Sequence, residues 1–199
     1  MSDLAVVPST PLLLSEHASL VDPVPQVRTA ALRAAAWLVA RATGPVLLVC
    51  AEPLGARVGR DLLAAAGWAG PVDDLVATAA AADAGDADPL PGAVLAVADG
   101  TARRGPDAPG GHDPRAAGFD ERVEQALRDG DPGALSRLDQ ALARELLCAG
   151  APVLRLVGRV VPAPASSWLD LAEDPFGVRY WVARWQGGAA GRMRAPTRG

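Results

Sequence analysis

Apolar positions along the chain form short unbroken runs that alternate with longer stretches of helical spacing. Residues 4–7, 45–50 and 93–98 are runs without a polar residue. A strand of that composition is buried on both faces, as in a parallel sheet covered by helices. Between the runs, apolar residues recur every three or four positions, as at Val27 and Ala31, which predicts amphipathic helices. The alternation predicts an α/β fold, a three-layer α/β/α sandwich with a mostly parallel central sheet.

The same patterns predict the remaining elements. Helices are predicted at residues 22–42, 57–66, 116–129 and 131–150. Residues 153–161 are predicted as a strand and residues 162–175 as a proline-bearing loop. Residues 72–82 fit either a weak helix or a remnant strand, and residues 83–91 are predicted to form a surface linker. Residues 177–185 alternate with a period of two, which predicts a final strand that is antiparallel or at the sheet edge.

Length and composition predict one domain. The chain has 199 residues, 50% of them hydrophobic, which is enough for a substantial core. We expect a single domain at residues 1–186 and a disordered, arginine-bearing tail at residues 187–199. No run approaches the roughly 18–20 apolar residues of a membrane helix, and the acidic N-terminus does not resemble a secretory signal. The sequence therefore predicts a cytoplasmic protein without membrane contact.

The charge and the cysteines narrow the partners. The net charge is −4, which gives no electrostatic basis for nucleic-acid binding. Cys50 and Cys148 each end an apolar stretch, and a single pair at that spacing indicates buried free thiols rather than a zinc site or a disulfide framework. A small-molecule ligand is the partner that the sequence favours, and an oligomer stays open.

The most polar stretch between predicted elements is residues 99–119, a glycine-rich loop that follows the third apolar run. Loops at the carboxyl ends of strands are where α/β proteins bind ligands. Its candidate ligand-binding residues are Asp99, Arg103, Arg104, Asp113 and Arg115, with Asp120 beyond them. Arginine forks in this loop suit a carboxylate or phosphate group. Alternatively, the arginines and aspartates pin the loop and cap the following helix, and the two interpretations are compatible.

A metal site is a further candidate at the same edge of the sheet. His17, Glu52 and His112 follow the first, second and third apolar runs, respectively. Two histidines and a carboxylate are a recurrent iron-binding set, and Asp99 and Asp113 are substitute carboxylates. The alternative is that these are solvated loop residues. Ser9 and Thr10 are interpreted as turn residues, because no local motif supplies a base that would activate them.

Several blocks of the chain carry a family resemblance. They are VVPSTPLL at residues 6–13, ADGTARR at 98–104, HDPRAAGFD at 112–120, GDPGAL at 130–135 and PFGVRYWV at 175–182. Together they resemble actinobacterial proteins similar to the iron-binding subunit of class III extradiol ring-cleavage dioxygenases. The resemblance implies a three-layer fold with a metal pocket at the carboxyl ends of the strands. In the enzymes, two histidines and a glutamate hold Fe(II), and a further histidine is the acid/base in ring opening of a catechol.

The family's functional residues are missing at the matching positions. Val6 and Val7 occupy the place of the first metal histidine, residues 101–103 that of the catalytic histidine, and residues 149–152 that of the metal glutamate. We therefore expect a pocket for a small anionic or aromatic ligand and no cofactor held by the family's own residues, Fe(II) being the one that the resemblance implies. An active Fe(II)-dependent dioxygenase with ligands relocated to His17, Glu52 and His112 stays open. So does a non-catalytic interaction module that uses the final strand and the loop.

Overall fold

The computed structural model describes residues 2–17, 22–78 and 92–188 of the chain. Its centre is a six-stranded sheet of order β3-β2-β4-β1-β6-β5. The parallel strands are β1 (Ser2–Val7), β2 (Val46–Cys50), β3 (Val72–Val76) and β4 (Gly92–Val97), and the antiparallel pair is β5 (Ser166–Glu173) and β6 (Tyr180–Gln186). No helix within the described residues is long and apolar enough to cross a membrane.

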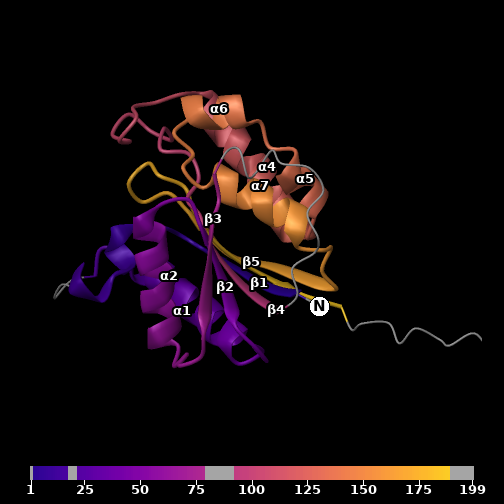
Figure 1. Cartoon of the computed structure of the whole chain (residues 1–199). Coiled ribbons are helices and arrows are strands. Elements are labelled where there is room, and N and C mark those ends of the chain that lie inside the picture. Colours follow the sequence, from indigo (N-terminus) through magenta and orange to yellow (C-terminus); the bar gives the residue numbers. More distant parts are fainter. Residues whose placement is uncertain (1, 18–21, 79–91, 189–199) are drawn as a thin grey trace, which may run out of the picture.

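Helices cover both faces of the sheet (Figure 1). On one face lie α1 (Pro25–Val39) and α2 (Pro53–Ala65), and on the other α4 (Arg115–Asp129), α5 (Pro132–Ser136), α6 (Gln140–Glu145) and α7 (Ala151–Val160). Two short 3-10 turns, η1 (Pro11–Leu13) and η2 (Ser15–His17), follow β1. The predicted α/β fold with its mostly parallel sheet is confirmed.

Alternate residues of the central strands enter two separate cores. Leu4 and Val6 of β1 belong to the core beneath α4–α7, whereas Ala5 and Val7 belong to the core beneath α1 and α2. All of these side chains are fully buried. Because both faces of the strand are covered, no position on it tolerates a polar side chain, which is why the sequence shows unbroken apolar runs.

The predictions for residues 153–161 and 162–175 were wrong. The first segment forms α7 rather than a strand, and the second contains the edge strand β5 rather than only a loop. Buried side chains are so frequent in α7 that its sequence lacks a clear polar face, and a short apolar run fits a helix or a strand equally well. Pro152 occupies the first turn of α7, where proline is tolerated. Pro162 and Pro164 precede β5 and leave the strand itself free of proline.

Smaller differences concern the other predicted elements. The helix predicted over residues 131–150 is two helices, α5 and α6, and Asp139 caps the second by accepting hydrogen bonds from the Ala141 and Leu142 amides. Residues 72–76 form a strand, the second of the two alternatives considered. The final strand is antiparallel as predicted, but it lies inside the sheet because β5 occupies the edge. The predicted linker at residues 83–91 and most of the predicted tail, residues 189–199, lie outside the described residues.

Gly150, which precedes α7, allows a close approach of two segments. A Cβ atom at this position would overlap the Asp99 carbonyl oxygen and lie 2.7 Å from Ala98 Cβ. We expect Gly150→Ala to lower the free energy of unfolding by about 2–3 kcal/mol, because the backbone cannot move aside easily. Gly44→Ala is the control, since a Cβ there meets nothing within 4 Å. Urea denaturation of both variants checks this, and equal effects at the two positions would contradict it.

Candidate functional site

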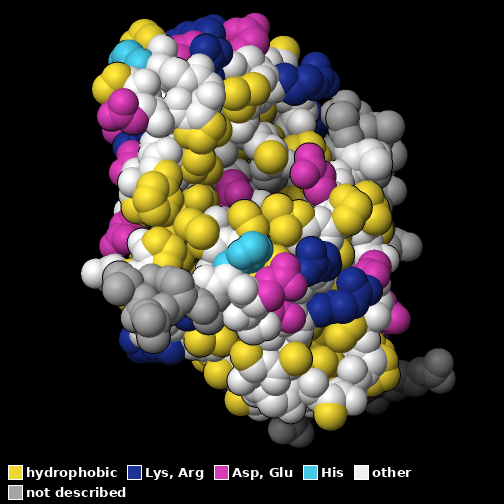
Figure 2. Space-filling model, turned by 90° about the vertical axis from the view of Figure 1, so that its left-hand side faces the viewer, with side chains coloured by type: hydrophobic (Ala, Val, Ile, Leu, Met, Phe, Trp, Pro, Cys, Tyr) yellow, Lys and Arg dark blue, Asp and Glu magenta, His cyan; other side chains and the backbone are white. Residues whose placement is uncertain are grey.

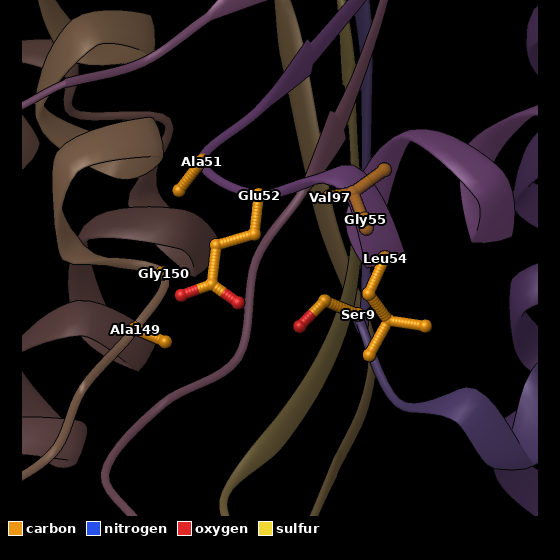
Figure 3. Close-up of a pocket in the computed structure, with 8 residues that line it drawn as sticks. All are labelled: Ser9, Ala51, Glu52, Leu54, Gly55, Val97, Ala149 and Gly150. Atoms are coloured by element: carbon orange, nitrogen blue, oxygen red, sulfur yellow. The ribbon is translucent and has the colours of Figure 1, made fainter.

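A small pocket lies at the carboxyl ends of β1, β2 and β4, where they meet the turn before α7. Its lining residues are Ser9, Ala51, Glu52, Leu54, Gly55, Val97, Ala149 and Gly150 (Figure 3). Its volume is about 30 Å³, which is room for roughly two water molecules. The pocket is therefore sized for small polar groups of a ligand rather than for a whole aromatic ring.

Strand register brings Ser9 and Asp99 together at this pocket. Val7 of β1 pairs with Val97 of β4, so the residues two positions further along lie level with each other. Asp99 Oδ1 accepts a hydrogen bond from the Ser9 amide at 2.7 Å, and its Oδ2 accepts one from the Ser9 hydroxyl at 2.6 Å. Burial raises the pKa of Asp99 to about 6, against the opposing effect of these two bonds. This carboxyl therefore changes protonation close to neutral pH.

The backbone of Asp99 joins three parts of the chain. Its carbonyl oxygen accepts a hydrogen bond from the Gly150 amide at 3.1 Å and one from Cys148 Sγ at 3.6 Å. Asp99 also forms an isolated antiparallel bridge with Tyr180 at the start of β6. The end of β4 is thereby fixed against the first strand, the last strand and the turn before α7.

Glu52 supplies the second carboxylate of the pocket. It precedes α2 without capping it through its side chain, and within the described residues its carboxylate has no hydrogen bond or ion pair. Figure 3 shows this carboxylate and the Ser9 hydroxyl facing one another across the pocket. Because Ser9 donates its only hydroxyl proton to Asp99, its oxygen is an acceptor toward the pocket. The arrangement thus offers two acceptors to a ligand that donates hydrogen bonds.

The arginines predicted to bind an anion are engaged within their own loop. Arg104 Nε donates to Asp174 Oδ2 at 2.6 Å, and Arg104 Nη1 lies 3.5 Å from Asp120 Oδ2. Arg103 Nη1 donates to the Glu145 carbonyl oxygen at 3.0 Å. These contacts are the ones that the loop-pinning interpretation requires.

Arg115 and Asp113 form a pair at the start of α4. Arg115 Nη2 lies 2.8 Å from Asp113 Oδ2, and Arg115 Nη1 lies 2.8 Å from Glu145 Oε2. Hydrogen bonds from Arg115 lower the pKa of Asp113 to about 2, so this carboxyl stays ionised at neutral pH. Both side chains belong to the anchoring of the loop rather than to the pocket.

Asp120 anchors the start of the loop from the helix side. Its fully buried carboxylate accepts hydrogen bonds from the Thr101 amide at 3.1 Å and the Thr101 hydroxyl at 2.7 Å. Burial raises the pKa of Asp120 to about 6 in spite of these bonds and the nearby Arg104. Asp120 therefore holds the backbone immediately after Asp99 in place.

The three candidate metal ligands do not come together. His17 lies in η2, where its ring is 3.7 Å from the Glu16 carboxylate, and Glu16 in turn pairs with Arg57 of α2 at 2.8 Å. His112 is exposed in the loop, and Figure 2 shows the two histidines in separate parts of the surface. Among the residues that the structure describes, no group of three or more histidines, cysteines, aspartates or glutamates could hold a metal ion. A shared sheet edge is thus insufficient to form the relocated metal site.

The Ser9–Asp99 pair was missed because its partners are 90 positions apart in the chain. Each residue follows an apolar run by the same short distance, but the sequence does not show that β1 and β4 are neighbours.

The segments that carry the family resemblance surround this pocket. Val7 lies two positions before Ser9, and Ala149 and Gly150 line the pocket directly. Neither a scan of the sequence against protein-family models nor a search of curated proteins gives a match.

The raised pKa of Asp99 predicts a pH dependence of stability. A carboxyl with a pKa of about 6 when folded and an ordinary value of 3.8 binds its proton more tightly in the folded protein. Its contribution to the free energy of unfolding therefore falls as the pH rises from about 4 to about 6. We expect Asp99→Asn to reduce the loss between about pH 4.5 and about pH 7 by about 1–2 kcal/mol, as Asp120 retains its own share.

Urea denaturation at the two pH values measures this change. Asp113→Asn is the matched control, because the pKa of Asp113 is lowered to about 2 and its titration lies below this window. An Asp99→Asn variant that keeps the full wild-type pH dependence would show that the Asp99 carboxyl is not buried.

Proposed function

We propose that this protein is similar to the iron-binding subunit of class III extradiol ring-cleavage dioxygenases and binds a catechol-type phenol at the carboxyl-end pocket without the family's iron. The observation that carries the proposal is the pair of acceptors, Ser9 Oγ and the Glu52 carboxylate, that face each other across this pocket. A catechol presents two adjacent hydroxyl donors. The pocket is also where the blocks of the resemblance converge, through Ala149 and Gly150 on one side and Ser9 on the other.

The charge of the pocket decides between the two ligand classes that the sequence suggests. A free Glu52 carboxylate repels a ligand anion and attracts a hydroxyl donor. The loop arginines do not offset this, because Arg104 and Arg115 are paired with aspartate and glutamate side chains. An aromatic ligand with hydroxyl groups is therefore favoured over an anionic one.

The size of the pocket fixes how such a ligand would lie. A volume of about 30 Å³ holds the hydroxyl groups and excludes the ring. The ring would lie at the mouth, beside the Leu54 side chain, which lines the pocket. Asp99 has an indirect part, since its hydrogen bond with the Ser9 hydroxyl orients the Ser9 oxygen toward the ligand.

Ring cleavage by the family's route is not part of this proposal. Val6, Val7, Ala149 and Gly150 stand at two of the family's metal positions, and their side chains offer no metal ligand. The proposed role is thus binding of a phenol by a relative without the family's iron centre.

Calorimetric titration with catechol tests the proposal. We expect wild-type protein to bind catechol, and to bind guaiacol, in which one hydroxyl is methylated, about tenfold more weakly. Glu52→Gln should weaken catechol binding about tenfold, because a neutral amide is a poorer acceptor than a carboxylate. Glu121→Gln on the exposed face of α4 is the matched control and should bind like wild type.

Two outcomes would contradict this function. The first is the absence of catechol binding by the wild-type protein at millimolar ligand. The second is equal affinity of the Glu52→Gln and Glu121→Gln variants, which would place the phenol elsewhere.

A further inference from the structure

A larger cavity lies on the other side of the turn at residues 148–152. Its volume is about 340 Å³, and its lining residues are Gln140, Ala143, Arg144, Leu147, Cys148, Ala149, Ala151 and Pro152. Cavities of this size are typical of small-molecule sites, which combine apolar walls with a few polar groups. Here the polar groups are Gln140 and Arg144, and the remaining lining is apolar. Ala149 is shared with the smaller pocket, so the two sites are neighbours.

The Gln140 amide has no partner among the described residues. The residue is only 8% exposed, and its Nε2 atom is buried without a hydrogen bond. A buried amide that is left unsatisfied destabilises the folded protein. Because the amide can rotate by half a turn, it can present either a donor or an acceptor to a bound molecule.

Positive charge dominates the polar part of this cavity. Arg144 lies in the last turn of α6, and within the described part of the chain its guanidinium forms no ion pair. Ala151 and Pro152 belong to the first turn of α7, so the positive end of this helix dipole also faces the cavity. Burial raises the pKa of Cys148, so its thiol stays neutral and adds no negative charge. No acidic side chain lines the cavity among the described residues.

Leu147 forms part of the apolar wall at a cost in backbone energy. Its φ of 55° lies in the left-handed region, which a leucine rarely adopts. Its side chain remains 50% exposed. Strained backbone of this kind persists only where the surrounding structure imposes it, and it is concentrated at ligand sites.

We propose that this cavity binds a small apolar carboxylic acid. The hydrocarbon part would contact Leu147, Ala143 and Pro152, and the carboxylate would receive hydrogen bonds from Arg144 and Gln140. An anion is the ligand that satisfies both the partnerless amide and the unpaired guanidinium. The proposal stands on different residues from those that bind the phenol and holds whatever the smaller pocket binds.

Titration with 2-naphthoate, compared with its neutral isostere 2-naphthamide, tests the proposal. We expect the wild-type protein to bind 2-naphthoate with sub-millimolar affinity and the amide at least about fivefold more weakly. Arg144→Gln should reduce 2-naphthoate binding to the level of the amide. Arg33→Gln is the matched control, because Arg33 is an equally exposed arginine of α1, on the opposite face of the sheet.

A second variant separates a binding role of Gln140 from a structural one. Gln140→Met replaces the unsatisfied amide with an apolar group of similar size, so the thermal midpoint should rise while 2-naphthoate binding weakens at least about fivefold. A merely structural residue would not move these two quantities in opposite directions. The proposal is overturned if 2-naphthoate does not bind at millimolar concentration, if Arg144→Gln binds it like Arg33→Gln, or if Gln140→Met binds it like wild type.

Discussion

The site at the carboxyl edge of the sheet depends on one residue, Asp99. Its carboxylate holds Ser9 after β1, its carbonyl oxygen holds the Gly150 amide before α7, and its backbone bridges to Tyr180 of β6. Burial of a carboxylate in this position costs solvation energy, which is why its pKa is raised. The same contacts orient the Ser9 oxygen and bring the turn at Gly150 close enough to close the smaller pocket. Stability and binding at this edge are therefore linked through one buried acid.

The parallel part of the fold could be predicted because burial on both faces leaves no ambiguity in the sequence. Residues 4–7, 45–50 and 93–98 have no polar position, and each forms a central strand. Residues 153–161 failed the same test because α7 is nearly as buried as a strand, and so short an apolar run carries no distinct period. β5 was missed because it is the exposed edge strand, and the nearby prolines at 162 and 164 suggested a loop.

The candidate site could be predicted residue by residue but not as an assembly. Asp99 and Glu52 were identified as polar residues that follow strands, and both lie at the carboxyl edge. Their grouping with His17 and His112 failed, because η2 directs His17 toward α2 and the loop keeps His112 exposed. Pairing Ser9 with Asp99 requires the order of strands in the sheet, and pairing Gln140 with Arg144 around a cavity requires the turn between α6 and α7. Neither is encoded in local periodicity.

The central claim is that a buried Asp99 carboxyl organises this edge of the sheet, and its own titration tests that claim most directly. Carbon-13 NMR of the labelled aspartate carboxyls, with Asp99 assigned through the Asp99→Asn spectrum, measures its pKa in the intact protein. The account predicts a midpoint near the value of about 6 that burial imposes. A midpoint at the ordinary value of 3.8 or below would mean that this carboxyl is solvated, and the proposed role of Asp99 in the pocket would be wrong.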